Sequence, residues 1–234
     1  MKIILDKVPK KVKIIEGFPG FGLIGTIVTE FLIEHLKPEM IGTFEYDEMP
    51  ATVAIHDGKL INPMGVFYDK KNNLIIMHTI LNSVGLEWNI SKSVRSMAQN
   101  TECNEIICIE GVASPNSTEN KKVFYFADDR TKEKVSKLPV EQLKESIIVG
   151  VTSALMLQKD VPVTCFFAET KTKIPDSKAA ANIIKVLNEY LGLNVDVNPL
   201  LEQAEKFEKK FKNILKQSSM MNKKKEKRDL SYFG

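Results

Sequence analysis

Apolar residues recur along the chain with two spacings, which predict alternating strands and helices. Residues 12–16 form a short apolar run with strand character. In residues 23–36 the apolar positions return every three or four residues, the spacing of one helix face, and the pattern closes before Pro38. GFGLIG, residues 20–25, lies between the two. We therefore expect a strand, a glycine-rich turn and a helix at the start of the chain.

The next part of the chain is rich in strands. Short runs of β-branched, aromatic and aliphatic residues follow one another without a helical pattern between them, and turn residues such as Asp57-Gly58 divide them. These runs are residues 40–46, 51–56, 60–61, 64–68 and 74–80. Consecutive strands with short connections predict hairpins.

The second half returns to alternating elements. Helical patterns cover residues 86–98 and most of 139–158, and strands are predicted over 105–110, 123–127 and 161–168. The sequence IICI inside 105–110 is typical of a strand that is covered on both faces. Asp176 is a candidate N-cap for a helix over 177–191, with Gly192 as its stop. Asn198-Pro199 then opens a helix over 200–216.

Length and composition suit a globular protein. A chain of 234 residues with 43% hydrophobic residues can bury a substantial core without disulfides. We expect an α/β core domain over residues 1–175 and a helical hairpin over 176–216 packed on or beside it. Residues 217–234 are expected to form a flexible basic tail.

Little in the composition points to chemistry or to a membrane. The cysteines, Cys103, Cys108 and Cys165, are odd in number and suit reduced thiols in a cytoplasmic protein. No apolar run approaches the roughly 18 residues of a membrane span. The histidines, His35, His56 and His78, are too scattered for a metal site. No triad context is present either, so we expect no catalytic residues, no metal, no cofactor and no enzymatic activity.

The net charge of +3 is concentrated near the C-terminus. Between Lys216 and Arg228 six basic residues stand against one acid, so this stretch carries +5 and the rest of the chain −2. The stretch has few apolar residues and is expected to be flexible. Nucleic acid is an unlikely partner, because no aromatic residues are interleaved with the charges to stack on bases. The final LSYFG is apolar again, which suggests that something binds it.

The glycine-rich turn has two interpretations. A strand, G-x-G-x-x-G and a helix, followed by Glu45 at the end of the next strand, match the spacing of a dinucleotide site. Against this, Pro19 lies inside the turn, and strands rather than a crossover helix follow Glu45. We favour a tight turn in which backbones approach closely. An anion at the helix N-terminus remains open, with candidate residues Gly17, Gly20, Gly22 and Gly25. The loops 17–22, 82–85 and 111–116 can converge on one rim of the sheet.

Four segments together resemble the proteasome assembly chaperone family in its archaeal form. They are EGFPGFGLIGTIVTEFLIEHL, YDEMPATVAIHDGKL, NPMGVFYDKKNNLIIMHT and ICIEGVASPNS, and the resemblance covers about residues 8–215. Such sequences were formerly likened to ATP-grasp or carboxylate-amine ligases. The resemblance implies a three-layer α/β sandwich of the phosphorylase-like kind with a mixed sheet and a helical C-terminal extension. It also implies a homo-oligomer that binds α subunits of the proteasome core particle.

The C-terminal residues resemble the docking motif of proteasome activators and some assembly factors. That motif is a hydrophobic residue, a tyrosine and any residue, whose ring and terminal carboxylate enter pockets between α subunits. Tyr232, Phe233 and Gly234 match it, with phenylalanine in the tyrosine place. The missing hydroxyl would cost about 1 kcal/mol of binding. We expect an assembly chaperone or adaptor that binds through this tail. The alternative is a nucleotide- or phosphate-binding enzyme that uses the turn 17–25.

Overall fold

A central β-sheet organises the computed structural model, which describes residues 1–47, 51–56, 58–81, 83–113, 121–170, 174–202, 206 and 213. The strands are β1 Lys2–Leu5, β2 Lys13–Gly17, β3 Glu39–Glu45, β4 Ala54–His56, β5 Lys59–Ile61, β6 Met64–Asp69, β7 Leu74–Thr79, β8 Glu105–Ala113, β9 Val123–Ala127, β10 Glu141–Gln142 and β11 Val163–Thr170. The helices are the 3-10 turn η1 Phe21–Leu23, α1 Ile24–Leu36, α2 Glu87–Asn100, α3 Asp129–Val135, α4 Val151–Met156, α5 Ser177–Leu191 and α6 Asn198–Glu202.

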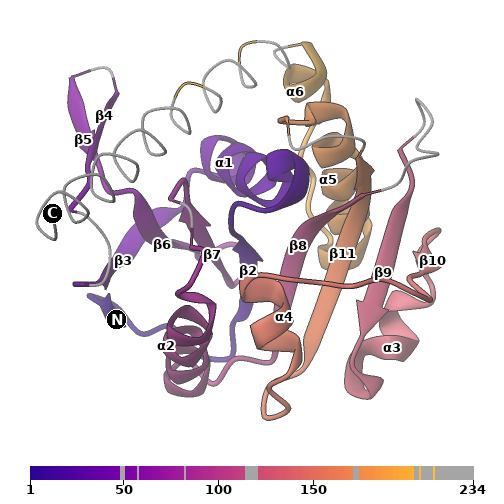
Figure 1. The fold of residues 1–234 in the computed structure, drawn as a ribbon, viewed down its shortest axis with the longest axis horizontal. Coiled ribbons are helices and arrows are strands. Elements are labelled where there is room, and N and C mark those ends of the chain that lie inside the picture. The colour runs from indigo at the N-terminus through magenta and orange to yellow at the C-terminus, as the bar shows by residue number, and fades with distance from the viewer. Residues whose placement is uncertain are drawn as a thin grey trace, which may run out of the picture.

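Nine strands form one mixed sheet in the order β1-β3-β6-β7-β2-β8-β11-β9-β10 (Figure 1). The four central strands β7, β2, β8 and β11 are parallel to one another, while β7 pairs antiparallel with β6 and β11 pairs antiparallel with β9. The antiparallel pairs β3–β6 and β6–β7 confirm the predicted hairpins, and β4 and β5 form a separate antiparallel pair. Parallel strands in the middle need crossover helices, which α1 and α2 supply.

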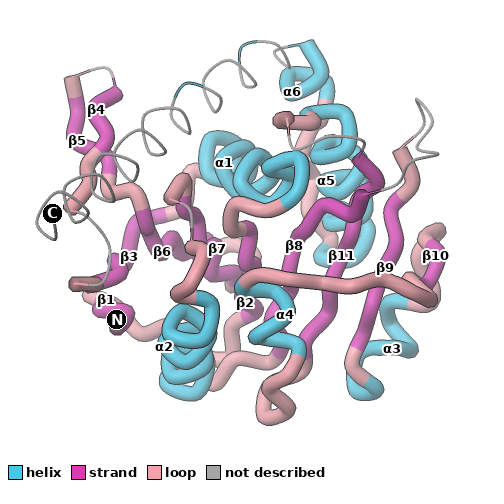
Figure 2. The backbone as a smooth tube through the Cα atoms, viewed as in Figure 1, coloured by secondary structure: helices cyan, strands magenta, loops and turns pink. Residues whose placement is uncertain are grey.

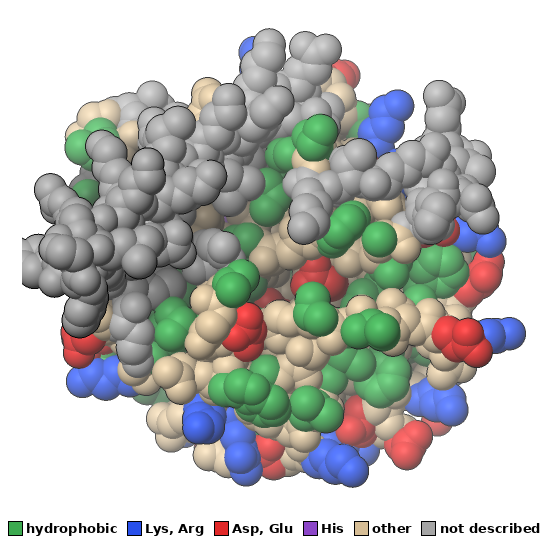
Figure 3. Space-filling model, in the orientation of Figure 1, with side chains coloured by type: hydrophobic (Ala, Val, Ile, Leu, Met, Phe, Trp, Pro, Cys, Tyr) green, Lys and Arg blue, Asp and Glu red, His purple; other side chains and the backbone are tan. Residues whose placement is uncertain are grey.

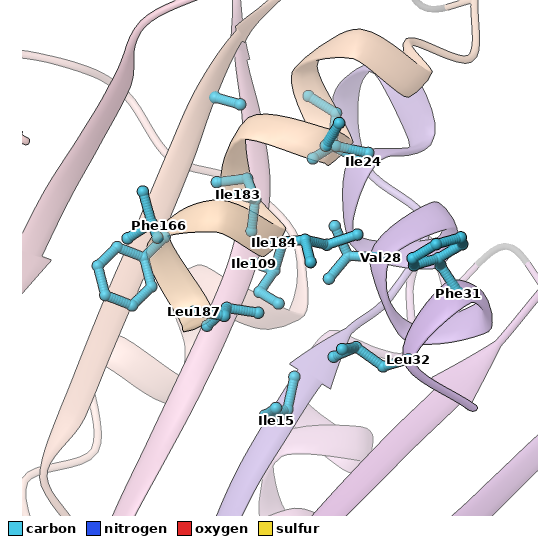
Figure 4. Packing of buried hydrophobic residues seen from close by; sticks show 14 of the residues in the cluster. Ile15, Ile24, Val28, Phe31, Leu32, Ile109, Phe166, Ile183, Ile184 and Leu187 are labelled. Atoms are coloured by element: carbon cyan, nitrogen blue, oxygen red, sulfur yellow. The ribbon is translucent and has the colours of Figure 1, made fainter. Parts of the chain in front are cut away.

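Helices cover both faces of this sheet, so the fold has three layers (Figure 2). One hydrophobic cluster joins the sheet to α1 and α5, and another joins it to α2 and α4. Adjacent residues alternate between the two clusters, as Ile14 and Ile15 do in β2. Figure 4 shows Val28 of α1 facing Ile184 of α5 above the sheet. The predicted α/β class with a mixed sheet and helical layers is therefore confirmed.

A buried carboxylate ties the amino ends of three central strands together. Glu105, at the start of β8, is 2% exposed. It accepts hydrogen bonds from the Thr164 hydroxyl at 2.6 Å and from the Tyr190 hydroxyl, and it forms an ion pair with Lys13. Burial and the bond to Glu105 raise the pKa of Tyr190 above its usual range. This network links β2, β8, β11 and α5.

The prediction of a mostly helical segment over 139–158 is wrong. Only α4, residues 151–156, is helical; β10 lies at 141–142, and residues 143–150 have no regular structure. Ile148 is partly buried against the core, whereas Ile147 and Val149 are 91% and 74% exposed and residues 144–146 are exposed as well. The apolar positions of this segment therefore do not form the continuous buried stripe of a helix.

The structure also contains elements that the periodicity did not indicate. β1 lies at the edge of the sheet beside β3, and α3 follows β9. Most of the predicted helix over 200–216, the whole of the tail 217–234 and its expected flexibility lie outside the described residues. Among the described residues, no helix is both long and apolar enough to cross a membrane.

Candidate functional site

The carboxyl ends of four parallel strands meet at one edge of the sheet. β2 pairs in parallel with β7 and β8, and β8 pairs in parallel with β11. The segments that leave β2 and β7 therefore emerge at the same edge, which is where open α/β sheets bind ligands. The sequence also predicts that a third loop, residues 111–116, reaches this edge. The structure describes only residues 111–113 of that loop. This edge contains the glycine-rich turn and is the candidate site.

The glycines of the turn allow backbones to approach closely. A Cβ atom on Gly17 would lie 2.3 Å from the Gly25 carbonyl oxygen, and one on Gly25 would lie 2.6 Å from the Ile109 carbonyl oxygen. Gly22 has φ +68°, a conformation that favours glycine. The turn thus brings the start of α1 against β2 and β8, which is the close-approach role favoured from the sequence.

A side chain of the protein itself accepts a hydrogen bond from an amide of the turn. Glu110, near the end of β8, accepts hydrogen bonds at Oε1 from the Phe21 and Gly111 amides, both at 3.0 Å. A Cβ atom on Gly20 would lie only 1.8 Å from that oxygen. An anion bound at a helix N-terminus uses such amides. Here the Glu110 carboxyl takes the place that a phosphate oxygen would have at the Phe21 amide.

A second carboxyl group, Glu16, lies beside the first. Glu16 is 1% exposed and accepts hydrogen bonds from the Phe18 amide at 3.1 Å and the Thr152 hydroxyl at 3.2 Å. Burial raises the pKa of Glu16 to about 7. Burial, as the larger cause, and the nearby charge of Glu16, as the smaller one, raise the pKa of Glu110 to about 8. Both groups therefore change protonation near neutral pH.

Such a carboxyl pair has pKa values suited to acid–base chemistry. Its oxygens, however, are used in internal hydrogen bonds that hold the turn and the start of α4. Two cavities, of about 500 and 650 Å³, lie elsewhere, beside the N-terminal strand β1. The pair is therefore explained by its role in holding the edge of the sheet together.

His78 in β7 lies between a hydroxyl group and a carboxylate, as the catalytic histidine of a serine protease does. Here these contacts stabilise the fold. Its Nδ1 lies 2.9 Å from the Thr29 hydroxyl and its Nε2 3.0 Å from the Glu30 carboxylate. Thr29 is fully buried, and its hydroxyl also lies 3.0 Å from the Gly25 carbonyl oxygen. No substrate atom can reach that hydroxyl without opening the core. His78 is thus a satisfied core histidine, as the sequence suggested.

The remaining predicted residues are not brought to this edge. Glu45 ends β3, which is separated from β2 by the two strands β6 and β7, and pairs with Lys2 at 3.1 Å, so it cannot serve as the ribose-binding acid of a dinucleotide fold. His35 stacks on Phe31 with ring centroids 5.9 Å apart. Within the described part of the chain, no three ligand-type side chains gather as a metal site would require.

The tail residues Tyr232, Phe233 and Gly234 lie outside the described residues. The structure instead reveals exposed apolar residues that the sequence pattern assigned to a helix, Ile147 and Val149. Trp88 at the start of α2 is 54% exposed and Leu157 after α4 is 67% exposed. Figure 3 shows hydrophobic side chains gathered on this face, over α2 and α4. The sequence carries no signal for this segment, because Ile147, Ile148 and Val149 are all apolar and their different exposure depends on tertiary contacts.

Comparison with known proteins connects this architecture to a family. The sequence model of the PAC2 family matches residues 14–215. The uncharacterized protein MJ0106 of Methanocaldococcus jannaschii is 27% identical over 211 residues, which cover 89% of this chain and 87% of that protein.

Solved structures agree with the fold. The crystal structure of Pyrococcus furiosus PbaA, an archaeal homolog of proteasome-assembly chaperone, has a TM-score of 0.85 and 27% identity, and the match covers 94% of this chain and 99% of that one. P. furiosus PbaB, an archaeal proteasome activator, has a TM-score of 0.74 and 22% identity, with 91% and 98% covered. PbaB therefore shares the fold.

Proposed function

Because this chain belongs to the PAC2 family, we propose that it is a non-enzymatic chaperone or adaptor that binds α subunits of the proteasome core particle. The similarity to PbaA, which extends over nearly the whole of both chains, is the observation that carries this proposal. In the proposed arrangement the α/β body oligomerises and each copy presents its C-terminal tail to the α subunits. Repetition of the tail would add avidity without new contacts.

The geometry of the glycine-rich turn supports a role without catalysis. The Phe21 amide of the turn already donates to Glu110, as does the Gly111 amide of β8, and a Cβ atom fits at neither Gly17 nor Gly20. Removing Glu110 from its donors would leave buried amides unpaired, which costs about 1–3 kcal/mol each. A phosphate would have to offset that cost and displace a carboxyl group.

We place the contact with the α subunits in Tyr232, Phe233 and Gly234. Two aromatic rings can fill apolar pockets, and a carboxylate on Gly234 would pair with a lysine at the pocket rim. The basic run before them, Lys223 to Arg228, keeps this anchor away from the body and favours an acidic partner surface. Because the run is charged, binding should weaken as salt increases.

The test compares the full-length protein with a variant that lacks residues 232–234. Binding to purified α subunits is measured by surface plasmon resonance and light scattering at two salt concentrations. We expect the deletion to abolish binding, Phe233→Tyr to tighten it up to about fivefold through the added hydrogen bond, and Ser231→Ala, the matched control, to leave it unchanged. Failure of the full-length protein to bind would refute the proposal, and undiminished binding by the deletion variant would refute the role of the tail.

The alternative, a nucleotide- or phosphate-binding enzyme, has its own test. A ligand that binds the folded state at 100 times its Kd stabilises it by about 2.7 kcal/mol. ATP, NAD and inorganic phosphate at millimolar concentration are therefore added in thermal unfolding experiments. We expect an unchanged Tm. A rise that is lost on changing Glu110 or the turn would favour the enzyme instead.

A further inference from the structure

Lys134, near the end of α3, lies over the ring of Tyr190 at the edge of the sheet opposite the glycine-rich turn. Its Nζ is 4.1 Å from the centre of that ring, and the Nζ of Lys13 is 5.1 Å from the same centre. Lys13 pairs with the buried Glu105 at the start of β8. Two cationic side chains therefore share one aromatic ring and one buried carboxylate.

Contacts of α3 with the sheet hold Lys134 in this position. The Thr131 hydroxyl lies 2.9 Å from the hydroxyl of Thr164 in β11, and Thr164 donates a hydrogen bond to Glu105. This contact holds one side of the helix against the network around Glu105. Lys134 follows Thr131 by three residues, so both lie on the same side of α3. The helix thus directs Lys134 toward Tyr190.

Lys134 lacks a carboxylate partner of its own. The charge of Lys13 is matched by Glu105, and Lys137, which follows α3, pairs with Glu133 at 3.2 Å. Lys134 forms no ion pair with any residue that the structure describes. Desolvation is the larger cause, and the nearby charge of Lys13 a smaller one, of a lowered pKa at Lys134, while the charge of Glu105 raises this pKa by less.

The amine of a lysine in this setting is more nucleophilic near neutral pH than that of an ordinary surface lysine. Only the neutral amine has the lone pair that attacks a carbonyl carbon, and a second cation beside it increases the neutral fraction. The Tyr190 ring favours the ammonium form, which reduces this effect without reversing it. Lys134 is also exposed, so a small reagent can reach its Nζ.

We propose that Lys134 is an acylation site that reacts with acyl phosphates in preference to the lysines around it. With Lys13, Lys134 and Glu105 ionised, the cluster carries one net positive charge, which attracts an anionic acyl donor. Nζ attacks the carbonyl carbon and forms the amide bond. The bond from that carbon to the phosphate oxygen breaks with its electron pair, and the leaving phosphate takes the proton that the nitrogen loses.

Acylation would change the charge of the cluster. The amide is neutral, so the like charges of Lys134 and Lys13 no longer face each other. The ion pair of Lys13 and Glu105 then stands balanced beside the Tyr190 ring. This inference does not depend on binding to the proteasome.

The first experiment treats the full-length protein with millimolar acetyl phosphate and follows acetylation at each lysine over time by peptide mass spectrometry. We expect Lys134 to react about fivefold faster than Lys137, or more. Lys137 is the matched internal control, because it lies in the same part of the chain, is 72% exposed and is paired with Glu133. Equal or slower reaction at Lys134 would overturn the proposal.

A second experiment separates the effect of the neighbouring charge from that of exposure. Lys13→Met removes the second cation and should lower the rate at Lys134 to that at Lys137, whereas Lys13→Arg keeps a cation and should preserve the preference. Circular dichroism checks that both variants fold. If Lys13→Met does not fold, the pH dependence of the wild type decides, since the rate at Lys134 should level off at a lower pH than the rate at Lys137. An undiminished preference in Lys13→Met, or parallel pH profiles at the two lysines, would refute the proposed role of Lys13.

Discussion

Ionisation of Glu16 should reduce the stability of the fold near neutral pH. Burial raises the pKa of Glu16 from the ordinary value of 4.5 to about 7, even though the Phe18 amide and the Thr152 hydroxyl lower it. In the unfolded chain the carboxyl ionises near pH 4.5. Between the two values the folded state holds a proton that the unfolded state has released. The free energy of unfolding therefore falls as the pH rises through this window.

The expected loss follows from the width of the window. One pKa unit corresponds to about 1.4 kcal/mol, so the shift from 4.5 to about 7 predicts a loss of about 3 kcal/mol between these pH values. Glu110, with its pKa raised to about 8, acts in the same direction. Glu16→Gln keeps an oxygen for the Phe18 amide and offers a donor to Thr152 while removing the titration. At pH 8 the variant should be more stable than the wild type by up to about 3 kcal/mol.

The assay is urea unfolding followed by circular dichroism at pH 5, 6, 7 and 8, with the protein concentration held constant because self-association makes apparent stability depend on it. Measurements do not go below pH 5, since Asp128, whose pKa Arg130 lowers to about 2, loses its contribution only in stronger acid. Glu141→Gln, an exposed change, should follow the wild type. Parallel pH profiles for wild type and Glu16→Gln would refute the reasoning. A variant less stable than the wild type at pH 8 would show that the fold needs the carboxylate.

Three further changes test packing and the buried network. Glu105→Ala should destabilise the protein by about 3–5 kcal/mol in urea unfolding, because it leaves the partly buried Lys13 ammonium and the buried Tyr190 hydroxyl without their acceptor; the exposed Glu133→Ala is its control and should leave the midpoint unchanged. Gly17→Ala should cost more than about 3 kcal/mol or prevent folding, since the new Cβ would meet the Gly25 carbonyl oxygen at 2.3 Å, and retention of the wild-type Tm would contradict this steric role. Phe166→Ala, in a fully buried position, should lower stability by about 3–5 kcal/mol, with a lower urea midpoint and an unchanged m value.

Local signals in the sequence predicted the elements that they directly control. The helix α5 begins after Asp176, whose side chain accepts from the Ala179 amide at 3.1 Å, and ends at Gly192 with φ +69°. These residues act within one turn of their own position, so no distant contact is needed to predict them. The strand-rich middle and the apolar strand β8 were also predicted, because spacing alone separates them from helices.

Other features depend on contacts between residues far apart in the sequence. Residues 139–158 carry enough apolar positions for a helix, yet residues 141–142 pair with β9 as β10, and Ile148 is only partly buried against the core. The segment 143–150 therefore has no regular structure. The glycine spacing was visible in the sequence. That Glu110 would fill the turn was not, because it lies 90 residues beyond Gly20 and reaches it only when β8 pairs with β2.

The sequence by itself determined most of the helices and strands, the caps of α5 and which family the chain resembles. These properties depend on backbone conformation and on hydrophobic period, both of which are local. Only the tertiary structure decided the strand order, the burial of Glu16 and Glu110 with their raised pKa values, and the irregular segment 143–150. Each of these depends on which distant surfaces come together, and burial and hydrogen-bond partners exist only once they have done so.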